Sequence, residues 1–230
     1  MFVTGTDTGI GKTVVAAGIA NCLHRRGRRV AVCKPVATGC VHRREGLVSE
    51  DAEFLAQHAD TLHPLDLICP QRFAEPLAPA VAADRAKTSL DWCAIDRAIG
   101  LMSRDSDVMI VEGVGGVMVP MDDKHLVRDM IQWLSLPAVV VARAGLGTIN
   151  HTLLTIEALR SKGIEVAGVI INRYPVDGAN VAEETNPRVI EKSAKTPILC
   201  LIPEYKGAMG PNLPTDITEP LERVDWKKFC

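Results

Sequence analysis

The sequence predicts an α/β fold in which a mainly parallel β-sheet carries helices on both faces. Of the 230 residues, 47% are hydrophobic but only 4% are aromatic, so valine, isoleucine, leucine and alanine must build the core. A β-branched and alanine-rich interior is typical of parallel strands that are buried on both sides. Short apolar runs also alternate with segments of helical periodicity, which is the pattern of consecutive strand–helix units.

Each strand and helix can be assigned by its periodicity and by the residues at its ends. Strands are expected, in chain order, over residues 2–3, 29–33, 107–111, 138–142, 166–171 and 197–202. Helices are expected over residues 12–26, from residue 49 onward, within 77–86, and over 91–102 and 149–161. Gly27 and Gly163 should end two of these helices, and Ser49 should cap the N-terminus of another.

Three segments lack such a pattern. Residues 36–50 are polar and are expected to form a long loop, and residues 69–79 hold three prolines and should be irregular. Near the C-terminus, the prolines at 211, 214 and 220 argue against a long helix, so residues 206–230 stay unassigned. The length favours a single domain that spans residues 1–230.

A glycine-rich turn follows the first strand and leads directly into the first helix. It runs from Gly5 to Thr13 with the sequence GTDTGIGKT. Backbone N–H groups in such a turn and at the new helix N-terminus point into one concavity, where the helix dipole favours an anion. Lys12 would add a cation near the outer phosphates, and the Thr13 hydroxyl is a potential ligand of Mg²⁺. The spacing is a variant with one extra residue, but the context predicts a triphosphate-binding loop and a P-loop NTPase-like fold.

Polar or glycine-rich residues follow the predicted strands at their carboxyl ends. In a parallel sheet these ends share one edge, and ligands bind in the crevices beyond it. The residues expected at this edge are the loop 5–13, Lys34, Glu112, the segment 145–150, Asn172 and Pro203. Mg²⁺ prefers oxygen ligands, which Thr13, Asp51 and Glu112 could supply. Two lysines and a metal around a γ-phosphate would form an electrostatic clamp for phosphoryl transfer.

Charge and cysteine content argue against several classes of protein. Basic and acidic residues number 26 and 28, and the net charge of −2 argues against a nucleic-acid partner. The seven cysteines form no C-x-x-C pair and no zinc-ligand spacing, as expected for free thiols in a reduced compartment. No apolar run approaches the roughly 20 residues of a spanning helix, and the chain starts within its first strand. A cytoplasmic protein that needs no membrane is therefore expected.

Taken together, these residues resemble the dethiobiotin synthetase family, whose members are ATP-dependent carboxylases that close the ureido ring in biotin biosynthesis. The resemblance covers residues 2 to about 172. The stretches that carry it are FVTGTDT at 2–8 with GKT at 11–13, KPVATG at 34–39, Asp51, FAEP at 73–76, VEGVGG at 111–116 and GTINH at 147–151.

The resemblance implies a reaction and an assembly. The substrates would be ATP, CO₂ or bicarbonate, and 7,8-diaminononanoate (7,8-diaminopelargonate), with Mg²⁺ as the cofactor. A carbamate forms on one amine, its oxygen attacks the γ-phosphate to give a carbamic-phosphoric anhydride and ADP, and the second amine closes the ring and expels phosphate. The family is also a homodimer whose substrate site lies at the subunit interface.

The resemblance implies a role for each matching residue. Lys34 and Lys12 would be catalytic, and Thr13, Asp51 and Glu112 would hold the metal. The nucleotide would be bound by Thr8, Gly9, Ile10, Gly11, Lys12, Thr13, Val14, Asp51, Glu112, Gly113, Val114, Gly115, Asn172, Arg173, Pro203 and Glu204. Within this set, Asn172 would read the adenine. The diamine substrate would be bound by Thr38 and by Thr148, Ile149 and Asn150 of the partner subunit.

Two departures from the family leave the base preference open, and two other functions remain possible. Arg173 stands where many members carry Asp, and Glu204-Tyr205 replaces the common aromatic–apolar pair after Pro203. A partitioning-type ATPase switch would share the fold but would carry a second lysine early in the loop. A ligase related to the amide synthases would also share the fold, and usually carries a glutamine amidotransferase domain.

Overall fold

The structure is a computed structural model that describes residues 1–207, 210 and 212–229. Its centre is a six-stranded sheet in which every neighbouring pair is parallel, with the strand order β10-β9-β8-β1-β7-β2. In that order the strands are Ile198–Pro203, Val166–Tyr174, Ala138–Arg143, Phe2–Gly5, Val108–Glu112 and Val30–Cys33. The expected α/β fold with a mainly parallel sheet is therefore confirmed, and all six predicted strands are present.

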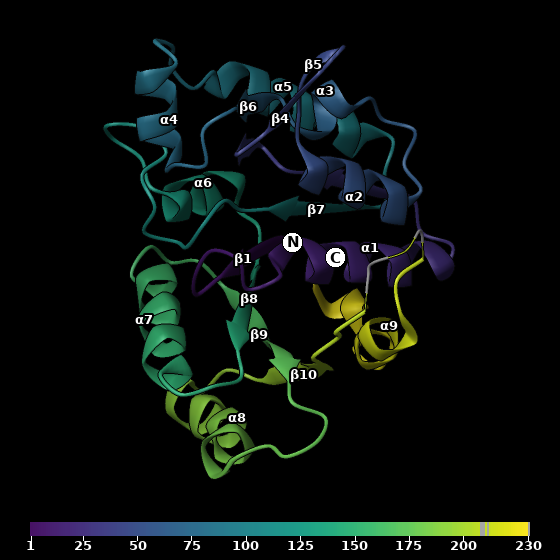
Figure 1. Cartoon of the computed structure of the whole chain (residues 1–230), viewed down its shortest axis with the longest axis vertical. Helices are drawn as coiled ribbons and strands as arrows, with labels where there is room; N and C mark the ends of the chain where they lie inside the picture. The colour runs from purple at the N-terminus through teal and green to yellow at the C-terminus, as the bar shows by residue number, and fades with distance from the viewer. Residues whose placement is uncertain (208–209, 211, 230) are drawn as a thin grey trace.

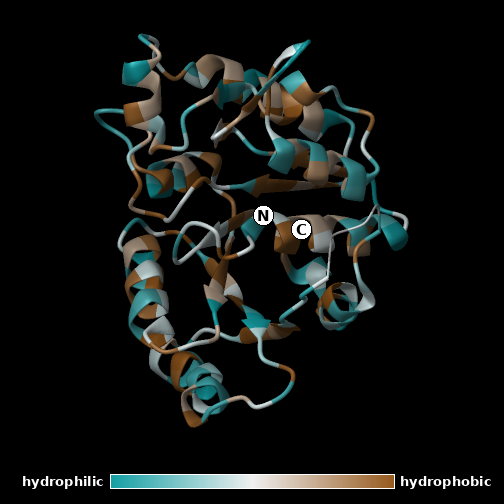
Figure 2. Ribbon diagram, viewed as in Figure 1, coloured by the Kyte–Doolittle hydropathy of each residue, from teal (hydrophilic) through white to brown (hydrophobic). Residues whose placement is uncertain are grey.

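Helices cover both faces of this sheet (Figure 1). The nine α-helices among the described residues are α1 Lys12–Arg25, α2 Glu50–Ala59, α3 Leu65–Ile68, α4 Pro79–Arg85, α5 Trp92–Arg104, α6 Val127–Leu134, α7 Thr148–Arg160, α8 Val181–Ala194 and α9 Thr215–Glu222. In the view of Figure 1, α7 and α8 lie to the left of the lower strands, while α1 and α9 lie to the right. The strands between them are largely brown in Figure 2, because their side chains are mainly apolar. Most side chains of β1, β8 and β9 are buried, whereas those of β10 are mostly half-buried.

The predicted helix starts agree with hydrogen bonds at the caps. The Ser49 hydroxyl oxygen accepts a bond of 3.2 Å from the Ala52 N–H and begins α2. The Asp91 carboxylate accepts a bond of 2.9 Å from the Ala94 N–H and begins α5. Each bond satisfies one of the N–H groups that a helix leaves unpaired in its first turn.

Two predictions about irregular segments were wrong. Residues 36–50, expected to be a long loop, contain β3 Val36–Thr38 and a hairpin of β4 Val41–Arg43 and β5 Gly46–Val48. Residues 69–79 contain β6 Gln71–Phe73, which pairs in parallel with β3 outside the main sheet. Strands of three residues are too short to show a periodic pattern, and β3 and β6 also lie more than 30 residues apart in the chain.

Four of the described helices have no counterpart in the predicted elements, namely α3, α6, α8 and, in the unassigned C-terminal segment, α9. The strongest missed signal is at α8, where the Asn180 side chain accepts bonds from the Ala182 and Glu183 N–H groups. The Glu183 carboxylate accepts the Asn180 N–H at 2.9 Å in return, which completes a capping box. Pro187 lies inside this helix, and proline disfavours helix interiors, so residue propensities alone do not predict a helix here.

The C-terminal segment, unassigned from the sequence, packs against the first helix. α9 lies on α1, and the absence of a side chain at Gly18 leaves room for Leu221 of α9. After α9, a 3₁₀ turn at Trp226–Phe229 buries Trp226, whose indole N–H donates to the Leu221 carbonyl oxygen at 2.8 Å. The C-terminal segment is thus part of the hydrophobic core.

No helix within the described ranges combines the length and the apolar character needed to cross a membrane. The six cysteines that the structure describes are free thiols, as expected, and Cys230 lies outside the described residues.

Leu221→Ala tests whether the C-terminal segment stabilises the core. Leu221 is completely buried, so we expect its truncation to lower the free energy of unfolding by about 2–5 kcal/mol. Leu62→Ala makes the same chemical change at a fully exposed position, where the loss should stay within about 0.5 kcal/mol. Urea unfolding followed by circular dichroism measures both, and equal losses would contradict the packing of Leu221 between α9 and α1.

Candidate functional site

The glycine-rich loop from Gly5 to Thr13 connects β1 at the centre of the sheet to α1. β1 lies between β7 and β8, so the loop emerges where the carboxyl ends of three parallel strands meet. Within the loop, the Lys12 ammonium donates a hydrogen bond of 2.8 Å to the Asp7 carbonyl oxygen. The Lys12 side chain is thereby folded across the loop, and the loop closes around the N-terminus of α1.

A cavity of about 400 Å³ lies beside the loop and collects most of the predicted site. Its lining residues are Thr8, Gly9, Gly11, Lys12, Thr13, Val14, Lys34, Thr38, Asp51, Glu112, Gly113, Val114, Gly115 and Arg173. Every one of them is a predicted site residue. They come from the loop, from the ends of β2, β3, β7 and β9, and from the first turn of α2, which confirms that these segments meet at one edge.

Lys34 is the centre of the polar contacts in this cavity. It follows β2 directly, and its ammonium lies 2.6 Å from the Asp51 carboxylate and 2.8 Å from the Glu112 carboxylate. Thr13 donates its hydroxyl hydrogen to the same Glu112 oxygen at 2.8 Å. Lys34 is 5% exposed and Glu112 only 1%, so burial strengthens the attraction between the two charges.

The two lysines in the cavity have opposite pKa shifts. Burial lowers the pKa of Lys34, but the neighbouring carboxylates of Glu112 and Asp51 outweigh it and raise the pKa above its ordinary value. For Lys12, burial lowers the pKa to about 8; Glu112 opposes this shift and the charge on Lys34 adds to it. Lys34 is therefore a fixed cation, whereas Lys12 loses its proton at about pH 8 unless an anion lies beside it.

The oxygen atoms at one side of the cavity fit Mg²⁺. The second Glu112 carboxylate oxygen is buried and has no hydrogen-bond partner within the described part of the chain, which is costly unless a cation or water binds it. Thr13 and Asp51 both lie near this carboxylate through the contacts above. The described residues contain no group of three acidic, histidine or cysteine ligands that could hold a metal ion alone.

The other predicted site residues do not line this cavity. Ile10 is buried within the loop, and Asn172 at the end of β9 donates its amide hydrogen to the Ile10 carbonyl oxygen at 2.8 Å. Pro203 ends β10, and the Glu204 N–H donates to the Tyr174 carbonyl oxygen at 2.8 Å. The remaining three are Thr148, Ile149 and Asn150, which form the first turn of α7. Their expected roles stay predictions.

Arg143 is a residue of this region that was not predicted. It is the last residue of β8, and its guanidinium lies 2.7 Å from the carboxylate of Asp7 in the loop. Both side chains are about half exposed, so the pair contributes little stability but restrains the outer side of the loop. Its position directly after the predicted strand 138–142 was the available signal, since Lys34 and Glu112 directly follow predicted strands in the same way.

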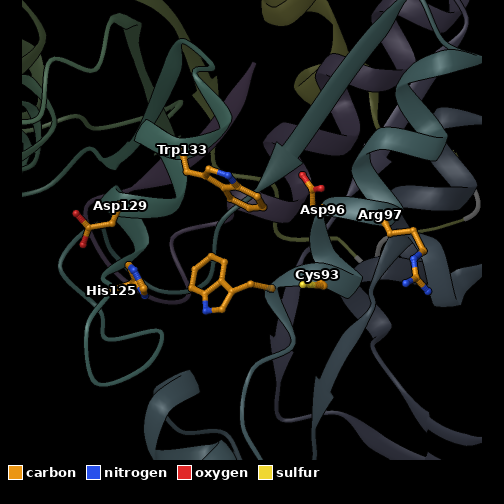
Figure 3. A pocket seen from close by; sticks show the side chains of 7 residues that line it. Cys93, Asp96, Arg97, His125, Asp129 and Trp133 are labelled. Carbon is orange, nitrogen blue, oxygen red and sulfur yellow. The ribbon is translucent and has the colours of Figure 1, made fainter.

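A larger hollow of about 670 Å³ lies away from the loop, between α5 and α6 (Figure 3). Trp92 and Trp133 line it with their rings nearly perpendicular and their centroids 5.7 Å apart. The Trp92 indole N–H is held by the Asp122 carboxylate at 2.7 Å. The hollow contains no residue of the glycine-rich loop and neither of the two buried lysines, so phosphate chemistry belongs to the smaller cavity.

The pKa of Lys12 predicts how nucleotide binding depends on pH. Below about pH 8 Lys12 is a cation that attracts phosphate, and above it the neutral amine does not. We therefore expect ATP affinity, measured without Mg²⁺ by calorimetry, to fall as pH rises from 7.5 to 9.5, approaching about tenfold per unit. The matched variant Lys12→Met should bind weakly at every pH, and a falling affinity in this variant too would exclude Lys12 as the titrating group.

Comparisons with known proteins agree with this geometry. The model of a family described as an AAA domain matches residues 1–212. The ATP-dependent dethiobiotin synthetase of Thermodesulfovibrio yellowstonii is 40% identical over 88% of this chain and 87% of its own length. The enzyme of the same name from Bacillus subtilis is 38% identical over 88% of this chain and 86% of its own length.

Solved structures with lower sequence identity share the fold alone. A ParA family ATPase from Chlorobium tepidum is 16% identical, has a TM-score of 0.59, and the match covers 100% of this chain and 98% of that one. The cell division ATPase MinD of Pyrococcus furiosus is 18% identical with a TM-score of 0.52, over 96% and 98% of the two chains. The match to these two synthetases covers 88% of this chain at 38–40% identity. The chain therefore belongs to the ATP-dependent dethiobiotin synthetase family.

Proposed function

We propose that this protein is a cyclo-ligase that converts 7,8-diaminononanoate, CO₂ and ATP into dethiobiotin, ADP and phosphate. The observation that carries the proposal is the buried pair of Lys34 and Glu112, with Thr13 bound to the same carboxylate, beside a phosphate-binding loop. Both reacting partners in such a synthesis, a carbamate and a triphosphate, are anions. A site with two lysines at its base matches them.

Each residue of the cavity has a place in this reaction. Backbone N–H groups from Gly9 to Val14 and the Lys12 ammonium would bind the outer phosphates, with the dipole of α1 adding to their attraction. Lys34, fixed as a cation, would lie between the carbamate oxygen and the γ-phosphate and stabilise the charge that develops during transfer. Thr38 borders the same cavity and would contact the diamine.

Mg²⁺ belongs to the proposal as the cofactor. Thr13, Asp51 and Glu112 would hold it, and the buried, unpaired oxygen of Glu112 is the observation that supports this assignment. When bound, Mg²⁺ neutralises charge on the phosphate oxygens. The carbamate oxygen attacks the γ-phosphorus and ADP leaves; the second amine then attacks the carbamic-phosphoric anhydride at its carbonyl carbon and phosphate leaves.

We also propose a homodimer in which the substrate site is completed at the subunit interface. A second hollow of about 480 Å³ adjoins the loop at Thr8, and the exposed apolar side chains of Met118 and Leu154 line it. Leu154 lies on α7, the helix whose first turn holds Thr148, Ile149 and Asn150. Exposed apolar groups beside a ligand site are typical of interfaces. A monomeric mass by light scattering at assay concentrations would contradict this assembly.

The sequence identity favours a synthetase over a switch ATPase of the same fold. The partitioning and cell division ATPases match at 16–18% identity, a level that indicates a shared fold but not a shared activity. The first residues of the loop also lack the second lysine expected of a partitioning ATPase, because Thr6, Asp7 and Thr8 stand there.

A reconstituted reaction tests the proposal directly. We expect purified protein with ATP, Mg²⁺, bicarbonate and 7,8-diaminononanoate to form dethiobiotin and phosphate in equal amounts, detected by mass spectrometry and phosphate release. Chelation of Mg²⁺ with EDTA should stop both. Phosphate release at the same rate with and without the diamine would reject the synthetase function in favour of a switch ATPase. Replacing ATP with CTP and GTP in the same assay determines the base preference.

Lys34→Ala tests the role of the fixed cation. We expect turnover to fall by about 10³-fold, because a positioned charge on the developing transition state is lost, while nucleotide binding is mostly retained. Lys162→Ala is the matched control, since Lys162 pairs with Asp129 at 2.8 Å outside the cavity and its loss should leave turnover unchanged. Circular dichroism verifies that both variants fold. An equal loss of ATP affinity and turnover would make Lys34 a ground-state binder instead.

A further inference from the structure

The side-chain amide of Asn172 contacts the phosphate loop rather than the open cavity. Asn172 lies near the carboxyl end of β9, is 5% exposed, and donates from Nδ2 to the Ile10 carbonyl oxygen at 2.8 Å. Ile10 is separated from it by 162 residues in the chain. The bond therefore connects the edge of the sheet to the middle of the loop.

We propose that Asn172 is a positioning residue that orients the N–H of Gly11 for phosphate binding. The peptide bond between Ile10 and Gly11 is trans, so its C=O and N–H point in opposite directions. With the Ile10 oxygen held on Asn172, the Gly11 N–H is directed away from β9, and Gly11 lines the nucleotide cavity. This inference rests on the proposed function, because it concerns how the same enzyme binds its triphosphate.

The residues around this peptide leave it little freedom. Gly11 has φ +90°, a left-handed conformation that favours glycine, and a Cβ atom there would collide with the Asn172 amide nitrogen. The Ile10 side chain is buried and fills the space where a Cβ atom of Gly5 would stand. The peptide is thus held by its oxygen from one side and by the isoleucine side chain from the other.

Binding of tripolyphosphate, which has no base, separates loop positioning from base recognition. We expect Asn172→Ala to weaken the binding of tripolyphosphate and of ATP by a similar factor of about ten. The buried Ile10 oxygen loses its hydrogen-bond donor, so the Ile10–Gly11 peptide can turn. Asn186→Ala is a matched control: Asn186 is also buried, and its amide donates to the Ala144 carbonyl oxygen at 2.9 Å, away from the loop. Its tripolyphosphate affinity should stay near that of the unchanged protein. Isothermal titration calorimetry without Mg²⁺ measures all of these affinities.

The outcomes separate this inference from the proposed function. If Asn172→Ala weakens the binding of ATP but not of tripolyphosphate, Asn172 recognises the adenine base and the positioning role is rejected. An equal loss in Asn186→Ala would also reject it, because any buried amide would then have the same effect. Failure of the unchanged protein to bind either ligand would overturn the proposed function together with this inference. Binding of both without dethiobiotin formation would contradict the proposed reaction alone.

Asn172→Asp provides a readout that a general structural role would not change. The new carboxyl group can donate to the Ile10 oxygen only when protonated, and repels that oxygen when ionised. Tripolyphosphate affinity relative to the unchanged protein should therefore recover as the pH falls from 8 to 5. A ratio that stays constant over this range would contradict a hydrogen bond from position 172 as the positioning contact.

Discussion

The buried ion pair between Lys34 and Glu112 is the interaction on which the rest of the site depends. Two buried charges must be paired, because removing one partner leaves the other buried without a counter-charge. That loss costs on the order of 3–5 kcal/mol. This requirement is met because β2 and β7 are neighbours, so the residues at their carboxyl ends meet. Thr13 binds the same carboxylate, and the loop, two strands and α2 become one electrostatic unit.

This unit separates the functions of two lysines that look alike in the sequence. Lys34 is neutralised by carboxylates and keeps its proton at any physiological pH, whereas Lys12 is buried beside another cation and holds its proton weakly. An arriving phosphate supplies the negative charge that Lys12 lacks. Phosphate binding therefore favours the protonated form of Lys12, which couples recognition of the anion to protonation of the loop.

The sequence predicted the large features because they are local or periodic. The six main strands, the glycine-rich loop and the ends of the strands that carry Lys34 and Glu112 each follow from runs of adjacent residues. The short strands β3 and β6 were missed because their stability comes from pairing with one another at a distance of more than 30 residues. The contact of Asn172 with Ile10 and the pair of Arg143 with Asp7 were missed for a related reason. Only the folded sheet brings the ends of β8 and β9 to the loop.

The packing of α9 on α1 has a consequence for the order in which the site can form. α1 begins within the phosphate loop, yet one of its sides is covered by Leu221, a residue more than 200 positions later in the chain. Contacts between such distant segments form late, because the intervening chain must first be ordered. On the ribosome the loop emerges about 200 residues before Leu221, which belongs to the layer that stabilises its helix. A nascent chain therefore carries the complete phosphate-binding motif long before it has the packing that holds the motif in shape.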